Sequence, residues 1–252
     1  MDRRRVVLLT SEGDSGEIAA RYLSQRFRDL AVVVEQSESR AVFLRRRLKR
    51  LGLVTVAGQI AFMLFQKLQQ WLAQTRIESI LSQLQLAASA TAVERVTSVN
   101  EPDCIAMLRK LDPAVVVVVG TRIISGEVLR AIPVPFINYH AGITPKYRGV
   151  HGGYWALAQS DRENCGATVH LVDEGIDSGA ILYQARIEPA LQDNFSTYPY
   201  LQLVAALPLL AQAAEDACEG RLACQVSSPP SRLWSHPTLW GYLAIGLRRG
   251  VW

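Results

Sequence analysis

Apolar residues in this chain gather into short runs that are separated by polar and helical segments. Residues 5–10 form the first run, residues 17–27 follow with helical spacing, and residues 30–34 form a second run with β-branched character. Residues 114–119 are an unbroken β-branched run, which is typical of a parallel strand buried on both faces. This alternation predicts an α/β fold with a doubly wound, mostly parallel sheet.

The rest of the chain continues the alternation and adds a long apolar helix. Apolar spacing and flanking turn residues delimit each element. The predicted helices cover residues 103–111, 126–132 and 198–219, and the predicted strands cover residues 135–139, 167–172, 181–187 and, at an edge, 222–225.

Residues 41–94 interrupt this order with a helical segment. The segment contains no proline and only two glycines, Gly52 and Gly58. Its spacing predicts two or three helices, at about residues 39–51, 54–73 and 77–90. We therefore predict a core over residues 1–190 that carries this insertion, and a helical extension over residues 191–252 that packs on the core.

Composition narrows the class of protein only slightly. Of the 252 residues, 49% are hydrophobic, which is enough for a substantial core, and the net charge of +4 is too small to indicate nucleic-acid binding. The first apolar run is too short for a signal peptide, so we expect a cytoplasmic protein. The four cysteines lack the spacing of metal ligands, so we expect no metal site.

Two segments that end in glycine-rich turns carry the candidate chemistry. Asn138 and His140 stand at the end of the strand predicted for residues 135–139, and Asp177 lies in a later turn. Ligands of open α/β sheets bind beyond the carboxyl ends of the strands. An amide can donate to an oxygen that gains negative charge, an imidazole can move a proton, and a carboxylate can orient the imidazole. The three groups together suit attack of an amine on a carbonyl carbon.

Four motifs around these residues resemble one enzyme family. They are INYH at 137–140, TPKYRG at 144–149, GATVH at 166–170 and DEGIDSG at 173–179. In this combination the chain resembles the folate-dependent formyltransferases, which include the methionyl-tRNA, glycinamide ribonucleotide and sugar N-formyltransferases. The resemblance covers residues 100–190 well and the first 35 residues loosely.

The resemblance implies a Rossmann-like core, N10-formyltetrahydrofolate as formyl donor and an amine as acceptor. Asn138, His140 and Asp177 match the family's catalytic Asn, His and Asp. Two loops match the backbone segments that hold the pterin. Their residues are Arg122, Ile123 and Ile124 in the first loop and Asp173, Glu174, Gly175 and Ile176 in the second.

Departures from the family pattern limit the choice of acceptor. Residues 142–145 read GITP where the family commonly has SLLP. Glu12 and Asp14 stand in the first loop, where two carboxylates would repel a phosphate, so glycinamide ribonucleotide is disfavoured. The C-terminal region predicts helices rather than the β-barrel expected of a methionyl-tRNA formyltransferase. We therefore expect a small or conjugated amine acceptor and no nucleic-acid partner.

A basic cluster in the insertion precedes an apolar run. The cluster consists of Arg45, Arg46, Arg47, Lys49 and Arg50. The apolar run, residues 51–65, is too short to span a bilayer. One interpretation is an interfacial element, residues 41–75, that makes peripheral contact with a membrane. The other, which we favour at this point, is a helical hairpin that covers a sheet edge or forms a homodimer contact, with a solvated basic face.

Three functions stay open from the residues alone. The first is direct formyl transfer to an amine, with Asn138 and His140 at the oxyanion and Asp177 orienting His140. The second is hydrolysis of the formyl donor by water with the same three groups. The third is a folate-binding or scaffold protein without catalytic activity, which the intact Asn, His and Asp set disfavours.

Overall fold

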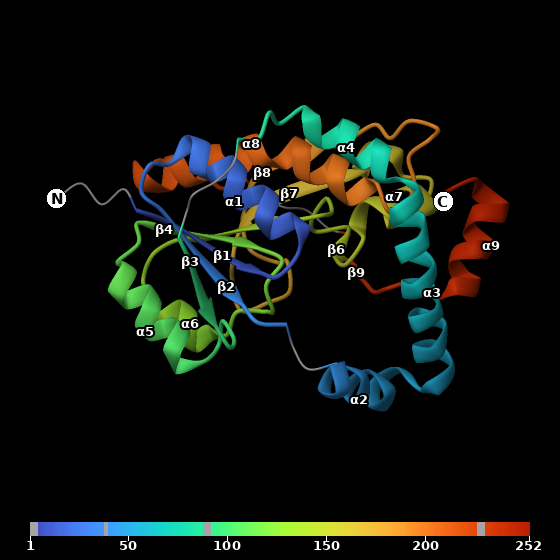
Figure 1. The fold of residues 1–252 in the computed structure, drawn as a ribbon, viewed down its shortest axis with the longest axis horizontal. Helices are drawn as coiled ribbons and strands as arrows, with labels where there is room; N and C mark the ends of the chain where they lie inside the picture. The colour runs from blue at the N-terminus through green and yellow to red at the C-terminus, as the bar shows by residue number, and fades with distance from the viewer. Residues whose placement is uncertain (1–4, 38–39, 88–91, 226–229) are drawn as a thin grey trace.

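Seven strands form one sheet at the centre of the molecule (Figure 1). The structure, a computed structural model, describes residues 5–37, 40–87, 92–225 and 230–252. The strand order is β3-β2-β1-β4-β5-β7-β8; the first five strands are parallel to one another, and β7 runs antiparallel to both of its neighbours, β5 and β8. The strands are β1 (Val6–Ser11), β2 (Leu30–Glu35), β3 (Val93–Val96), β4 (Val115–Val119), β5 (Phe136–His140), β7 (Gly166–Leu171) and β8 (Ile181–Arg186). The prediction of a doubly wound, mostly parallel α/β fold is confirmed.

The two faces of the sheet bury alternate residues of the same strands. In β1, Val6 and Leu8 face one core cluster, and Val7 and Leu9 face the other. The first face is covered by α1 (Asp14–Arg26), α4 (Gln74–Ser82) and α8 (Tyr198–Cys218), and the second by α5 (Pro102–Leu111) and α6 (Gly126–Ala131). Strand β4 is buried by both layers, which explains its unbroken valine run.

The inserted segment forms three helices, of which the third is shorter than predicted. They are α2 (Arg40–Leu51), α3 (Leu53–Leu72) and α4, which ends at Ser82 rather than at residue 90. Residues 88–90 of the predicted third helix lie outside the described residues. Strand β3 was not predicted, because at this sheet edge Val93 is half exposed and only Val96 of the strand is buried.

A third apolar cluster joins the insertion to the C-terminal part of the chain. Phe62 of α3, Tyr154, Phe195 and Tyr242 pack ring against ring. The remaining elements are β6 (Arg148–Gly149), paired with β9 (Leu233–Trp234), the helices α7 (Gly152–Ala158) and α9 (Leu239–Arg249), and a short 3₁₀ helix, Arg162–Asn164. The C-terminal segment therefore packs on the core at both α8 and α9, while its division from the core at residue 190 stays a prediction.

Two further expectations concern the ends of these elements and the membrane. The edge strand predicted at residues 222–225 is wrong in extent, because only Gln225 forms a bridge, with Ile181. No helix within the described ranges is long and apolar enough to cross a membrane.

Candidate active site

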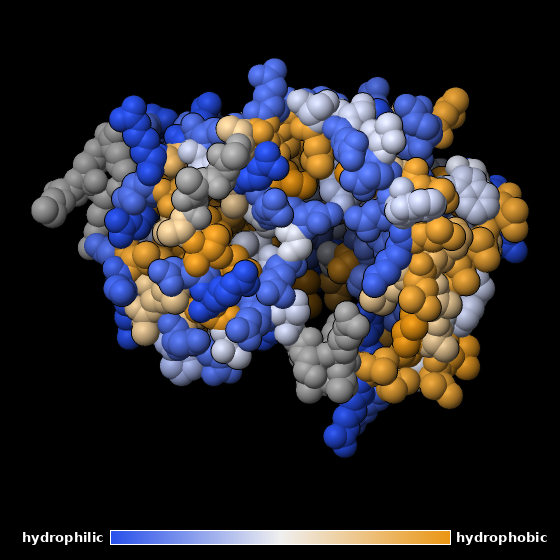
Figure 2. Space-filling model, in the orientation of Figure 1, coloured by the Kyte–Doolittle hydropathy of each residue, from blue (hydrophilic) through white to orange (hydrophobic). Residues whose placement is uncertain are grey.

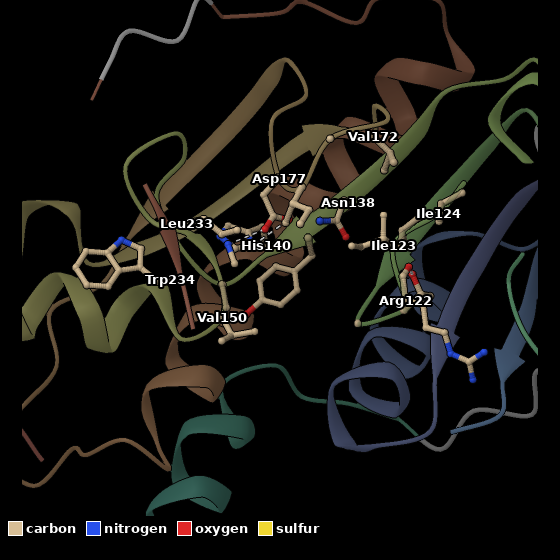
Figure 3. Close-up of a pocket in the computed structure, with 18 of the residues that line it drawn as sticks. Arg122, Ile123, Ile124, Asn138, His140, Val150, Val172, Asp177, Leu233 and Trp234 are labelled. Atoms are coloured by element: carbon tan, nitrogen blue, oxygen red, sulfur yellow. Dashed lines mark hydrogen bonds and ion pairs between the residues drawn. The ribbon is translucent and has the colours of Figure 1, made fainter. Parts of the chain in front are cut away.

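A cavity of about 910 Å³ opens beyond the carboxyl ends of β4 and β5 (Figures 2 and 3). Its walls come from the loop after β4, the end of β5, the loop between β7 and β8, the end of α2 and the segment around β9. Nine of the ten residues singled out from the sequence line it, and they are Arg122, Ile123, Ile124, Asn138, His140, Asp173, Gly175, Ile176 and Asp177. The tenth, Glu174, lies outside its wall.

Strand register brings the candidate catalytic groups onto one face of the sheet. Asn138 and His140 are two residues apart in β5, so both side chains project from the same side. Asn138 pairs across the ladder with His170 of β7. The loop that follows β7 then returns Asp177 to the same place, where its carboxylate contacts both histidines (Figure 3).

His140 is held between two oxygen atoms. Its Nδ1 lies 3.3 Å from Oδ1 of Asp177, and its Nε2 lies 2.7 Å from the carbonyl oxygen of Tyr147. Burial lowers the pKa of His140, while the Asp177 carboxylate and the Tyr147 carbonyl oppose that effect. Burial outweighs the two oxygens, so the pKa of His140 lies below its ordinary value, and a negative charge that develops nearby would favour the doubly protonated ring.

Glycine at position 142 makes this arrangement possible. A Cβ there would collide with the carbonyl oxygen of Tyr147 and would lie 2.7 Å from Nε2 of His140. The turn after β5 is held from the neighbouring strand by Thr168, whose hydroxyl donates to the Gly142 carbonyl at 2.8 Å and accepts from the Thr144 amide at 3.0 Å.

Asp177 is fixed by the segment that carries β6. Its Oδ2 accepts a hydrogen bond of 2.8 Å from the Gly149 amide, and its φ of 49° lies in the left-handed region. Burial raises the pKa of Asp177, but contacts with His170, His140 and the Gly149 amide together bring the pKa below its ordinary value. The carboxylate is therefore ionised at neutral pH.

His170 is a site residue that sequence reasoning did not single out. Its Nδ1 lies 2.8 Å from the Leu171 carbonyl and its Nε2 lies 3.1 Å from Nδ2 of Asn138. A hydrogen on Nδ1 donates to the Leu171 carbonyl, while Nε2 faces both Nδ2 of Asn138 and, at 3.7 Å, Oδ1 of Asp177. One N–H of the Asn138 amide thus lies beside Nε2, and the other remains for a ligand oxygen. The signal was present in the GATVH motif, but only the ladder shows that His170 faces Asn138.

A buried carboxylate holds the loop after β4. Glu35, at the end of β2, accepts hydrogen bonds from the amides of Arg122 at 2.6 Å and Val99 at 3.2 Å. The guanidinium of Arg122 turns away from the cavity, toward the Gln36 carbonyl, so this residue offers backbone rather than side chain to a ligand. The side chain of Ile123, in the same loop, is largely exposed.

The second predicted loop is closed on itself. Asp173 accepts from the Gly175 amide at 3.0 Å and from the Ser178 hydroxyl at 2.9 Å. Glu174 instead forms an exposed ion pair with Arg130 of α6 at 2.7 Å, which explains its absence from the cavity wall. Ile176 is partly exposed and gives the cavity wall an apolar side chain that a ligand can contact.

The far wall of the cavity comes from elements that sequence analysis did not connect to the site. Arg47, Arg50 and Leu51 arrive from the end of α2, and residues 233–236 arrive from β9 and the loop that follows it. A hydrogen bond of 2.9 Å joins Nδ1 of His236 to Nε2 of His151. Burial lowers the pKa of His236 to about 4. No cluster of three His, Cys, Asp or Glu side chains in the described part of the chain is placed to hold a metal ion.

Comparison with known proteins agrees with this geometry. Residues 28–199 match the formyl transferase family, and this span is more than half of the chain. The chain belongs to that family. Among curated relatives, a methionyl-tRNA formyltransferase of Pelotomaculum thermopropionicum is 33% identical over 123 residues, which are 48% of this chain and 39% of that protein. The matched region is therefore well under two thirds of the relative's length.

Solved structures share the fold of this formyl transferase family member. A glycinamide ribonucleotide transformylase of Symbiobacterium toebii aligns with a TM-score of 0.58 and 18% identity, covering 93% of this chain and 95% of that one. A sugar 3N-formyltransferase, solved in the presence of dTDP and 5-N-formyl-THF, aligns with a TM-score of 0.55 and 13% identity, covering 92% and 69%. At these identities the likeness concerns the fold alone.

Proposed function

We propose that this protein transfers a formyl group from N10-formyltetrahydrofolate to the amine of a small or conjugated acceptor. The observation that carries the proposal is the convergence of Asn138, His140, His170 and Asp177 on one wall of the cavity. Membership of the formyl transferase family supports it. The cavity residues fit such a donor, since the loops at residues 120–124 and 173–176 offer backbone groups and the apolar side chains of Ile123 and Ile176.

The bound donor would supply a formyl carbon that an acceptor amine attacks. The second N–H of Asn138 donates to the formyl oxygen as negative charge develops on it. His140 would take up the proton that the attacking amine releases and become doubly protonated, because the Asp177 carboxylate and the Tyr147 carbonyl accept its two N–H bonds. As the bond from the formyl carbon to the donor nitrogen breaks, that proton would pass to the departing nitrogen. Asp177 keeps His140 in place and lowers the cost of that protonation. No Ser or Cys nucleophile takes part in this scheme.

The acceptor side of the cavity is cationic. Arg47 and Arg50 stand on this wall beside His236. The first loop instead presents two carboxylates, of which Asp14 accepts from the Tyr200 hydroxyl at 2.5 Å and Glu12 pairs with Arg95 at 3.2 Å. We therefore expect the acceptor amine to carry an anionic group that is bound at the α2 wall and not at residues 11–16.

A screen of amines with the formyl donor tests the proposal, read by mass gain of one formyl group. We expect gain with at least one anionic amine, and loss of that gain in Asn138→Ala and His140→Ala variants that still bind folate. Formate release without amine, at the rate seen with amine, would show a hydrolase instead. Donor binding with neither product would show a non-catalytic folate-binding protein.

A further inference from the structure

One helix of the insertion, α3, is apolar on its exposed side as well as on its buried side. The side of α3 that faces the protein carries Val56 and Phe62, together with Gln59, which donates to the His236 carbonyl at 2.9 Å, and Gln69, which donates to the Tyr242 hydroxyl at 2.8 Å. The opposite side carries large apolar residues in solvent, spaced by four, at Ile60, Leu64 and Leu68. A helix that only covers a core carries polar residues on its exposed side instead.

The exposed apolar residues of α3 continue onto α9. Gly58 of α3 receives the ring of Trp240, so the two helices pack side by side. Leu64, Trp71 and Leu247 are 64%, 72% and 80% exposed. The set, called here the α3–α9 surface, comprises Leu53, Val54, Ile60, Met63, Leu64, Leu68, Trp71, Leu72, Trp240, Leu243 and Leu247. Figure 2 shows it as a broad hydrophobic area over both helices.

Charge is distributed just as unevenly as apolarity. Helices α2, α3 and α9 contain nine of the 27 Lys and Arg residues and none of the 23 Asp and Glu residues. The rest of the chain therefore holds 18 basic and 23 acidic residues, and its net charge has the opposite sign. Arg45, Lys49 and Arg50 are exposed on α2, which meets α3 at Gly52, next to Leu53. The positive charge thus lies directly beside the apolar surface.

We propose that the α3–α9 surface, together with the basic face of α2, docks on an anionic lipid membrane. Aliphatic side chains flanked by tryptophan and by cations match the boundary between acyl chains and acidic headgroups. A second copy fits less well, because a two-fold contact through the same helices would bring two sets of cations together. The interpretation of this insertion as a cover for a sheet edge does not account for the exposed row on α3.

The position of the cavity is consistent with such docking. Arg47, Arg50 and Leu51 of α2 line the cavity while their neighbours Arg45 and Lys49 face solvent. A docked molecule would therefore have an opening of its cavity close to the lipid headgroups. Docking itself does not depend on formyl transfer, so the two proposals can fail separately.

Flotation of the full chain with vesicles tests the docking without any turnover. We expect binding to phosphatidylcholine vesicles that contain phosphatidylglycerol, weaker binding without it, and weakening by salt. The double variant Leu64→Glu and Leu68→Glu should lose binding, whereas Leu191→Glu, at a fully exposed residue in the loop before α8, should keep it. Thermal melts check that each variant is folded. We expect them to be folded, because the substituted side chains are exposed.

Removal of two cations from α2 tests the electrostatic part of the docking independently. The double variant Arg45→Gln and Lys49→Gln should weaken partitioning roughly thirtyfold, since each cation near an anionic surface contributes about 1 kcal/mol. The control double variant Arg109→Gln and Lys110→Gln removes two exposed charges from α5. It should change vesicle partitioning by less than about threefold. No binding to anionic vesicles at low salt would overturn the proposal. So would a dimer, detected by light scattering, that the Leu64 and Leu68 variant separates while vesicle binding is absent.

Discussion

Replacing Asp177 with Asn changes the charge beside His140 and almost nothing in size. The carboxylate Oδ1 lies 3.3 Å from Nδ1 of His140, and the Asp177 side chain is only 15% exposed. At an effective dielectric constant of about 20, a unit charge pair at this distance interacts by about 5 kcal/mol. Rehydration of the vacated charge recovers part of this energy. We therefore expect the catalytic rate constant to fall by roughly 10³-fold, because the doubly protonated state of His140 becomes costly.

The assay compares the Asp177→Asn variant with the parent at saturating donor and the acceptor found in the amine screen. The affinity for the donor should change little, since the new side-chain amide keeps an oxygen for the Gly149 N–H, which donates to Asp177 at 2.8 Å. Glu174→Gln is the matched control, because it removes a carboxylate from the same loop outside the cavity. We expect that control to keep at least half of the parent rate.

A near-normal rate in the Asp177→Asn variant would refute the electrostatic role of this carboxylate. A loss shared equally by the Glu174→Gln control would instead point to disturbance of the loop. A large rise in the dissociation constant of the donor with little change in the catalytic rate constant would also contradict the reasoning, because it would make Asp177 a binding group.

Three further predictions concern the surroundings of this site. Gly142→Ala places a Cβ 2.7 Å from Nε2 of His140, so steady-state kinetics should show a loss of roughly 10²-fold, the cost typical of a misplaced catalytic group. Glu35→Gln weakens the anchor of the Arg122 amide, so titration should show about tenfold weaker donor binding with the catalytic rate constant nearly kept. The pKa of His236 is about 4 in the folded protein against an ordinary value of 6.5, so its contribution to stability is present above pH 6.5 and is lost as the pH falls toward 4. Urea unfolding at pH 7 and pH 5 should show a loss of up to about 2 kcal/mol from this group, and His236→Gln should reduce it.

The features predicted best from the sequence are the strands and helices whose pattern lies within one continuous segment. Buried strands such as β1 and β4 are visible because both of their faces are apolar. Strand β3 is not visible in the sequence. It lies at a sheet edge and three of its four residues are exposed, so it shows no alternation of apolar and polar residues. Helix α9 lies within the helical extension predicted for residues 191–252, and its bounds, which were not predicted, are marked by the Thr238 cap and by Gly250 at its end.

Contacts between distant segments account for what was missed in the cavity. The pairing of Asn138 with His170 follows from the antiparallel register of β5 and β7, which no spacing along the chain expresses. Glu35 becomes a loop anchor only because the parallel neighbours of β2 bring residues 99 and 122 to it. Likewise, Arg50 reaches the cavity through the insertion as a whole, so a local motif could not reveal it.

In the proposed function, the reacting groups come from the sheet, whereas the contacts that we expect to select the acceptor come mainly from the insertion. Asn138, His140 and His170 project from two paired strands, and a slip of one residue would turn all of their side chains to the opposite face. That register is fixed within the ladder, where Thr168 sits opposite His140 and holds the following turn. The cationic wall, by contrast, comes from α2 and the residues around β9, which are outside the sheet. If the acceptor binds at this wall as proposed, substitutions there should change which amine is used while the reacting groups stay in place.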